Sequence, residues 1–212
     1  MGKSLTLNTD RNCLVIGITG GIASGKTTVG QVYQGKGYPV IFTDLLAHKV
    51  MNFNNQAKAA LKQAFGNDIF DSDDLVIRKK LSEIVFSSTE NKLMLLNTIV
   101  HPFVIEEMIE LTDMYEGGGS KLVFIESALI YETNLDEGFD YIIDVFAEPD
   151  ICVKRAQSRG LAIEHINLIL QNQLDPVAKR NFADFAIENN KTLSELEESA
   201  MFLLNVLKEI AK

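Results

Sequence analysis

The chain has 212 residues, of which 46% are hydrophobic, and its 29 acidic and 20 basic side chains give a formal charge of −9. This length and apolar content suffice for a hydrophobic core and exclude a largely disordered chain. The negative charge argues against a nucleic-acid partner, which would require many phosphates to be neutralised. No apolar run approaches the roughly 20 residues of a membrane-spanning helix, and no signal peptide opens the chain. We therefore expect a soluble, cytoplasmic protein with no membrane partner and no obligate protein partner.

The two cysteines, Cys13 and Cys152, lie far apart in the sequence and lack the spacing of metal ligands. In a reducing cytosol such residues are usually buried thiols, so we expect neither a disulfide nor a metal site from them.

Residues 1–12 are polar and aperiodic, and they predict a flexible tail. The apolar run over 13–18 is typical of a buried parallel strand. A glycine-rich turn follows, then a helix that ends near Gly35, and then a second strand over 38–44. This order of elements predicts a βαβ unit and a parallel sheet.

Residues 45–116 show almost continuous helical periodicity, with three apolar stripes. Pro102 is expected in the first turn of a new helix, where a proline is tolerated. The glycines at 117–119 predict a firm stop. We expect a helical insertion between the second and third strands of the sheet.

The remaining chain returns to alternating strands and helices. Three later segments predict strands: 121–126, 139–147 and 183–189. Residues 149–182 are helical in pattern. Thr192 and Glu195 form a capping-box pattern that predicts the start of a terminal helix.

The strongest chemical signal is the segment GGIASGKT, from Gly20 to Thr27, which fits G-x-x-x-x-G-K-[ST] between a predicted strand and a predicted helix. Glycines let backbone N–H groups approach phosphate oxygens, and the following helix N-terminus favours the same anion. Lys26 would add a positive charge near the β- and γ-phosphates, and Thr27 would offer a hydroxyl to Mg²⁺. An ordinary glycine-rich turn is the alternative, but pattern and context together indicate a nucleotide-binding loop.

A phosphate-binding loop alone does not distinguish kinases from GTPases and motor-type ATPases. A GTPase would show D-x-x-G after a strand and an N-K-x-D motif that reads guanine. Asn190 and Lys191 are followed two positions later by Leu193 rather than aspartate, and no strand is followed by D-x-x-G. These absences weaken the hypothesis of a signalling switch.

Asp44 closes the second predicted strand, at the end where an open α/β sheet places its ligands. A carboxylate there could orient an acceptor hydroxyl and accept its proton as the phosphoryl group arrives. Alternatively, Asp44 caps the helix that begins at Leu45. Sequence spacing leaves both roles open.

Five segments resemble the dephospho-CoA kinase family in order and spacing: TGGIASGKTTV, VIFTDLLAHKV, RKKLSEIVF, LLNTIVHPFV and ESALIYET. The similarity extends over residues 13–207, and the pair His101-Pro102 is its least generic feature. This family transfers the γ-phosphoryl group of ATP to the ribose 3′-hydroxyl of dephospho-CoA, the last step of coenzyme A biosynthesis. The resemblance therefore implies ATP as phosphoryl donor, Mg²⁺ as cofactor and dephospho-CoA as small-molecule substrate.

The resemblance also implies an ATP site. Glu126, which ends a predicted buried strand, would hold Mg²⁺ with Thr27, and Asn189 would lie close to the adenine base. Arg155 and Arg159 are four residues apart and are expected on one helix face. They would act from a lid, as catalytic residues beside Lys26, although a solvated basic face is the alternative. The phosphates would be bound by ten consecutive residues: Thr19, Gly20, Gly21, Ile22, Ala23, Ser24, Gly25, Lys26, Thr27 and Thr28.

On the acceptor side, the resemblance makes Asp44 the catalytic base. Four more residues match family positions that could contact the substrate: His48, Arg78, His101 and Glu132. Arg78 could meet a phosphate or lie on a solvated helix face, and His101 could contact substrate or cap a helix. Three positions depart from the family pattern, so roles of the usual residues do not transfer to them: Phe42, Ile77 and Ala128.

These observations predict an α/β fold of the P-loop NTPase type, with three α/β/α layers and a parallel sheet of about five strands. Residues 13–44 and 117–212 would form the nucleotide-binding core, with a helical lid over about 150–182 that excludes water. Residues 45–116 would form a helical insertion that binds the CoA-type acceptor. Two rival functions stay open, a nucleoside or nucleotide kinase and a non-catalytic nucleotide-binding switch.

Overall fold

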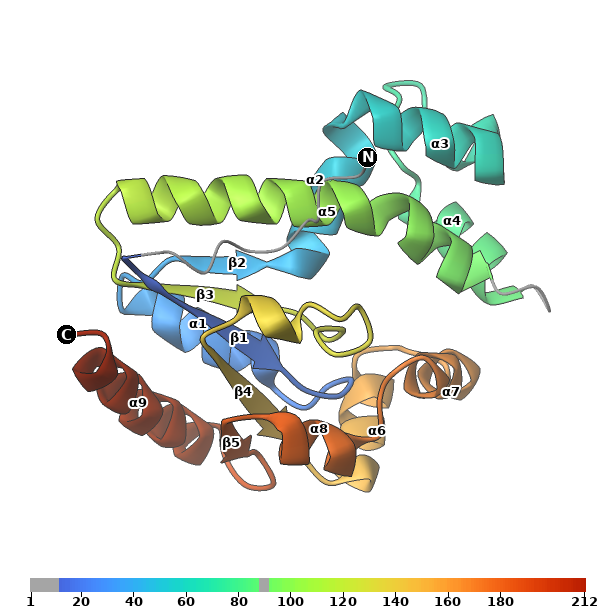
Figure 1. Cartoon of the computed structure of the whole chain (residues 1–212). Helices are drawn as coiled ribbons and strands as arrows, with labels where there is room; N and C mark the ends of the chain where they lie inside the picture. The colour runs from blue at the N-terminus through green and yellow to red at the C-terminus, as the bar shows by residue number, and fades with distance from the viewer. Residues whose placement is uncertain (1–11, 88–91) are drawn as a thin grey trace. The chain divides into compact units, whose positions relative to one another are not determined.

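The computed structural model describes residues 12–87 and 92–212, and the tail predicted over 1–12 lies, apart from Asn12, outside them. Figure 1 shows the chain's elements. The strands are β1 (Leu14–Thr19), β2 (Val40–Phe42), β3 (Leu122–Glu126), β4 (Tyr141–Phe146) and β5 (Phe185–Glu188). The helices are α1 (Lys26–Gly35), α2 (Thr43–Phe53), α3 (Asn55–Phe65), α4 (Arg78–Ser87), α5 (Lys92–Gly117), α6 (Pro149–Ser158), α7 (Ile163–Gln171), α8 (Pro176–Phe182) and α9 (Leu193–Ile210). Two 3-10 turns, η1 (Asn67–Ile69) and η2 (Asp136–Gly138), lie between them.

The described chain divides into two compact units. Residues 12–42 and 111–212 form one unit, which contains all the strands of the sheet. Residues 43–110 form the other, which is helical apart from the segment between α3 and α4. The boundary between the units falls inside α5.

Among the described residues the sheet has five strands in the order β2-β3-β1-β4-β5, and every neighbouring pair is parallel, as the sequence predicted. The carboxyl ends of the strands are in register, because Glu126 pairs with Phe42, and Thr19 pairs with Asp144. An open parallel sheet binds its ligands at this edge. The edge therefore brings polar ends of β1, β3 and β4 close to the loop that follows β1.

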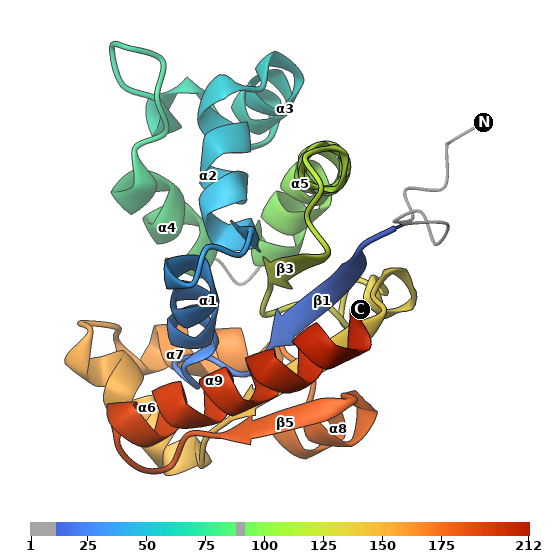
Figure 2. The same ribbon diagram turned by 90° about the vertical axis from the view of Figure 1, so that its left-hand side faces the viewer.

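One face of the sheet is covered by α1 and α9. Residues at alternate strand positions, such as Ile16 and Phe124, join Tyr33 of α1 and Leu207 of α9 in one buried core. Figure 2 shows α9 in front of the sheet beside α1. The opposite face is covered near β1 by the segment after β3, because a Cβ on Gly17 would contact the Ile130 side chain.

The structure differs from the predicted elements in three places. The second strand ends at Phe42 and not at residue 44, because the amphipathic pattern that buries Leu46 and Val50 already begins a helix at Thr43. The helical pattern over 45–116 is interrupted between α3 and α4, where Gly66 has a φ of 85° and a short antiparallel bridge follows. The helix α6 ends at Ser158, one residue before Arg159.

Pro102 is the clearest correction. It lies inside α5, a continuous helix of 26 residues, and not in the first turn of a new helix. A proline removes one backbone hydrogen bond and disfavours the helix interior. Here Val100, Val104 and Met108 are buried at four-residue intervals on the same helix, so burial of that stripe outweighs the local penalty.

Several local predictions are confirmed. The helix α5 ends at Gly117, and Thr192 and Glu195 form a complete capping box at the start of α9. Cys13 and Cys152 are both buried. Within the described ranges, no helix combines the length and apolar character that crossing a membrane requires.

Candidate active site

The loop from Gly20 to Thr27 joins β1 to α1, as predicted, and two of its glycines are required by close backbone approach. Gly20 has a φ of 150°, and a Cβ there would collide with the carbonyl oxygen of Val145. Gly25 has a φ of 109°, and a Cβ there would collide with the Asn189 side chain. A larger residue at either position would displace the loop from the end of β4 or from Asn189.

The end of the loop presents a helix N-terminus without a capping side chain. Gly25 is the N-cap residue of α1 and offers no side-chain acceptor to the first-turn N–H groups. The first turn of α1 also carries no acidic residue. Unpaired N–H groups and the positive end of the helix dipole make this position suited to a phosphate group.

Lys26, Thr27 and Glu126 meet at the carboxyl edge of the sheet. The ammonium nitrogen of Lys26 lies 3.8 Å from Glu126 Oε1, and Thr27 Oγ1 donates to the same oxygen at 3.4 Å. The side chains of Lys26 and Glu126 are only 11% and 3% exposed. The loop cation and the acidic residue predicted on β3 are therefore brought together in one sheltered place.

The donor set of this place fits a magnesium ion shared with a nucleotide. Mg²⁺ prefers oxygen ligands and usually binds through one or two protein groups together with phosphates and water. The hydroxyl of Thr27 and the carboxylate of Glu126 supply such oxygens side by side. Among residues 12–87 and 92–212, no group of three His, Cys, Asp or Glu side chains could hold a metal by itself.

Asn189 contacts the backbone of the phosphate loop, and Arg155 contacts Asn189. Asn189 Nδ2 donates to the backbone carbonyl of Ser24 at 2.7 Å, and Arg155 Nη2 donates to Asn189 Oδ1 at 3.4 Å. Asn189 is thus placed against the loop, and its contact with adenine stays a prediction. Arg155 belongs to α6, whereas Arg159 is its exposed C-cap residue, because Gly160 with a φ of 87° ends the helix there.

Four polar atoms around the loop are buried and have no hydrogen-bond partner among the described residues: Thr19 Oγ1, Ser24 Oγ, Asp144 Oδ2 and Arg155 Nη1. Asp144 is 2% exposed and lies in β4, two residues before the strand ends at Phe146. Burial raises the pKa of its carboxyl to about 6, although the positive charges of Lys179 and Arg180 oppose that rise. Buried polar groups normally find partners, so such unpaired atoms beside the loop are consistent with a polar ligand site.

Asp44 lies inside the first turn of α2, and the helix begins one residue earlier, at Thr43. Its carboxylate is exposed and makes no hydrogen bond or ion pair with any residue that the structure describes. The interpretation of Asp44 as a helix cap was therefore wrong. The chain places it two residues after Phe42, the residue of β2 that pairs with Glu126.

The unit of residues 43–110 brings two of the predicted substrate-binding residues close together. Asn52 donates from Nδ2 to the backbone carbonyl of His48 at 2.8 Å and accepts from the N–H of Val76 at 2.7 Å. This link holds α2 against the residues before α4, where Arg78 begins the helix. Burial and the neighbouring Arg78 charge lower the pKa of His48.

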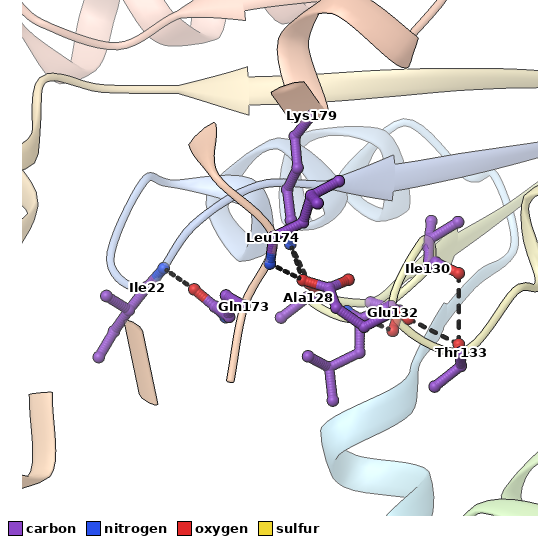
Figure 3. Close-up of polar contacts among 10 residues, drawn as sticks. Ile22, Ala128, Ile130, Glu132, Thr133, Gln173, Leu174 and Lys179 are labelled. Atoms are coloured by element: carbon purple, nitrogen blue, oxygen red, sulfur yellow. Dashed lines mark hydrogen bonds and ion pairs between the residues drawn. The ribbon is translucent and has the colours of Figure 1, made fainter. Parts of the chain in front are cut away.

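His101 and Glu132 are also placed. His101 is inside α5, so the prediction of a helix cap was wrong, and burial lowers the pKa of its imidazole. Glu132 forms an ion pair of 2.7 Å with Lys179 and accepts from the N–H of Leu174 at 2.6 Å (Figure 3). Contact of either residue with substrate stays a prediction.

Sequence reasoning missed three residues near the site, Asp144, Gln173 and Lys179. Asp144 interrupts an apolar strand, and that break in the pattern could have marked it. Gln173 and Lys179 lie in a polar stretch with no local signal, because their partners are far away in sequence.

Comparison with known proteins identifies related chains. The family model described as dephospho-CoA kinase matches residues 14–195. The chain is 36% identical to the dephospho-CoA kinase of Oceanobacillus iheyensis over 197 residues, covering 92% of this chain and 97% of the relative. It is 32% identical to the dephospho-CoA kinase of Lactobacillus acidophilus over 198 residues, covering 92% and 98%. Among solved structures, TT1252 from Thermus thermophilus is similar with a TM-score of 0.73, 30% identity and coverage of 92% and 98%. The dephospho-CoA kinase from Campylobacter jejuni has a TM-score of 0.69 at 24% identity, with coverage of 95% and 100%, and supports the fold.

Proposed function

The chain belongs to the dephospho-CoA kinase family and is a kinase of the last step of coenzyme A biosynthesis, and we propose how its residues divide that reaction. In this proposal the γ-phosphoryl group of ATP passes to the ribose 3′-hydroxyl of dephospho-CoA. The observation that carries it is the meeting of Lys26, Thr27 and Glu126 at the end of the phosphate loop.

On the ATP side, the loop residues from Thr19 to Thr28 bind the phosphates, chiefly through the N–H groups at the start of α1. Lys26 lies at this helix end and carries the charge that the β- and γ-phosphates need. Thr27 and Glu126 hold Mg²⁺, which when bound neutralises charge on the transferring group. The support is the 3.4 Å contact between their oxygen atoms.

The lid arginines act on the same phosphates. Arg155 and Arg159 bring two guanidinium groups to the end of α6, and Arg155 already contacts Asn189, which holds the phosphate loop. A guanidinium can hold two phosphate oxygens at once and stabilise the charge that develops during transfer. We assign both residues to this role and Asn189 to the nucleotide side of the site.

On the acceptor side, Asp44 is the base that orients the 3′-hydroxyl and accepts its proton. The carboxylate of Asp44 is exposed and has no hydrogen-bond or ion-pair partner among the described residues, which supports this role better than a structural one. His48, Arg78 and His101 bind the CoA-type acceptor, with Arg78 directed to a phosphate group. Glu132 is the fourth residue predicted on the acceptor side, but its contacts with Lys179 and Leu174 also allow a role in positioning the residues next to the phosphate loop.

A coupled assay of ADP release tests the function. Purified protein is given ATP and Mg²⁺ with dephospho-CoA, with nucleosides or with nucleoside monophosphates. Of these acceptors, only dephospho-CoA is expected to cause rapid ADP release, and the product should carry a new phosphate at the ribose 3′ position. Preference for a nucleoside or a nucleoside monophosphate would replace the proposal with the rival kinase. Binding of nucleotide without any acceptor-dependent turnover would favour the switch.

A further inference from the structure

The segment between α7 and α8 contacts the phosphate loop directly. Gln173 Oε1 accepts a hydrogen bond from the backbone N–H of Ile22 at 3.1 Å (Figure 3). Ile22 is the third residue of the loop, before the glycine that starts α1. One N–H of the loop is thus held by a neutral side-chain oxygen, which leaves the N–H groups nearer α1 for the phosphates.

The residue after Gln173 is fixed from the other side. The N–H of Leu174 donates to Glu132 Oε1 at 2.6 Å, and Glu132 lies in the segment that follows β3. Gln173 and Leu174 therefore join the phosphate loop to the segment that continues from Glu126 (Figure 3). Because Gln173 contacts Ile22 and Leu174 contacts Glu132, the backbone of residues 173–174 is held on both sides and has little freedom to move.

A buried lysine anchors this connection. Lys179 of α8 is 1% exposed, and its ammonium nitrogen lies 2.7 Å from Glu132 Oε1 and 2.6 Å from the carbonyl oxygen of Ala128. Burial lowers the pKa of Lys179, and the hydrogen bond and charge of Glu132 oppose this shift only in part. Removing one partner of such a buried pair leaves the other charge uncompensated, so the pair resists rearrangement.

The same part of the loop also packs against the lid helices. Ile22 and Ala23 join Ala156 of α6 and Ile166 of α7 in a small apolar cluster. The loop is consequently held at one position by side-chain packing from α6 and α7 and by the Gln173 hydrogen bond from the residues after α7. These contacts all involve Ile22 or its neighbour.

We propose that Gln173 is a positioning residue for the kinase reaction, which fixes the phosphate loop through the N–H of Ile22 and is itself held by the Glu132–Lys179 pair. In this arrangement Glu132 acts through Leu174 and Gln173 on the ATP site, and not on the acceptor. The inference rests on the proposed use of the phosphate loop for ATP. A loop held in its binding conformation loses less freedom when ATP binds, so Gln173 lowers the ATP concentration that the enzyme needs.

Gln173→Met tests the hydrogen bond, because methionine keeps the length of the side chain but lacks the amide oxygen. Gln171→Met is the matched control, since Gln171 is exposed two residues earlier and makes no side-chain hydrogen bond within the described chain. We expect ATP binding, titrated without acceptor, to weaken roughly threefold to tenfold in Gln173→Met alone. The KM for dephospho-CoA should stay unchanged. Gln173→Glu keeps an acceptor oxygen at this position, so the backbone N–H of Ile22 should stay as protected from amide hydrogen exchange as in wild type.

Amide hydrogen exchange gives a readout that does not depend on catalysis. The peptide that contains Ile22 should exchange faster in Gln173→Met than in wild type or in Gln171→Met. Wild-type exchange together with wild-type ATP affinity in Gln173→Met would overturn the proposal, even if the wild-type enzyme is fully active. A wild-type enzyme that binds ATP but phosphorylates no dephospho-CoA would instead contradict the proposed function and leave this hydrogen bond testable.

Glu132→Gln separates the two assignments of Glu132. Glutamine still accepts from Leu174 but no longer compensates the charge of Lys179, so we expect lower thermal stability and weaker ATP binding together. A raised KM for dephospho-CoA with unchanged ATP affinity would return Glu132 to the acceptor site and remove it from the anchor of Gln173.

Discussion

Lys26 combines a sheltered position with a charge that we propose to act on the phosphates of ATP. Its ammonium is 11% exposed and lies 3.8 Å from Glu126, but this pair bridges the phosphate loop and β3 without being part of the apolar core. Lys26→Ala should therefore reduce kcat at least about 100-fold, the size of effect expected for losing one charge-stabilising donor. Circular dichroism should show that the fold is intact, while the thermal midpoint should fall because the buried Glu126 loses the charge of Lys26.

Lys36→Ala is the control for this change, because Lys36 is the exposed residue after α1 and forms no ion pair with the described residues. It should leave both turnover and stability unchanged. Near-normal turnover of Lys26→Ala would remove Lys26 from the mechanism.

Asp144 gives a prediction about pH. Its pKa rises from 3.8 to about 6 in the folded chain because the carboxyl is buried. Between these two values the native state binds more protons than the unfolded state, so the free energy of unfolding falls as pH rises from about 4 to about 6. The change corresponds to about 3 kcal/mol at most. Above about pH 6, Asp144 causes no further change in the free energy of unfolding.

Asp144→Asn should remove this part of the pH dependence, because asparagine has the same shape and does not ionise. Urea unfolding at pH 4 and pH 7 measures it: relative to wild type, the variant should gain stability at the higher pH. Asp150→Asn, an exposed change in the first turn of α6, should leave the wild-type slope in place. Parallel pH profiles for Asp144→Asn and wild type would show that the carboxyl titrates normally.

At the scale of elements, local chemistry was a good guide where the signal and its cause lie in the same few residues. The phosphate loop, the glycine stop after α5 and the capping box of α9 are such cases. Pro102 shows the opposite. It lies inside α5 because the burial of Val100, Val104 and Met108 stabilises the helix through the proline. The end of α6 was missed because a four-residue spacing places Arg155 and Arg159 on one face only if the helix continues.

The lid arginines carry the prediction at this scale. Replacing Arg155 or Arg159 by lysine keeps the charge and loses the planar group with several donors. Each change should lower kcat roughly 10-fold or more while altering ATP binding less. If both groups act on one phosphoryl unit, as proposed, the double variant should lose less than the sum of both effects. Steady-state kinetics beside ATP titrations without acceptor measures this.

Lys154→Ala is the control on the same helix, because Lys154 is exposed between the buried positions of α6 and makes no ion pair with the described residues. Unchanged kcat in both single variants and in the double variant would assign Arg155 and Arg159 to a solvated surface.

At the scale of the whole molecule, the predicted residues divide between the two units. The loop, Glu126, Asn189 and the lid arginines belong to the unit with the sheet, whereas Asp44, His48 and Arg78 belong to the helical unit. Motifs and family resemblance in the sequence predict both sets. The sequence could not identify Gln173 or Lys179, because the contacts of Ile22 with Gln173 and of Glu132 with Lys179 join segments that periodicity treats separately.

This division predicts the behaviour of Asp44→Asn. Because the residues proposed to bind the phosphates are in the other unit, ATP affinity should stay within about twofold of wild type, whereas kcat should fall at least about 100-fold if Asp44 is the proposed base. The exposed position of Asp44 in the first turn of α2 contributes only about 0.3–1 kcal/mol to stability through the helix dipole.

Calorimetric titration of ATP, steady-state kinetics and thermal unfolding measure the three quantities. Asp68→Asn, an exposed change in η1 of the same unit, should match wild type in all of them. A large loss of stability with unchanged kcat would mean that Asp44 is structural and that the base lies elsewhere.

The strand order has a consequence for how the chain acquires its fold during synthesis. The strand β1 pairs only with β3 and β4 in the described sheet, so it has no neighbour until Leu122 and the residues after it have emerged from the ribosome. The helices of residues 43–110 are complete before that point. Long-range strand pairing is slow, because a long loop must be closed before the contacts form. The nascent phosphate loop therefore has no sheet to support it while residues 28–122, nearly half of the polypeptide, are translated.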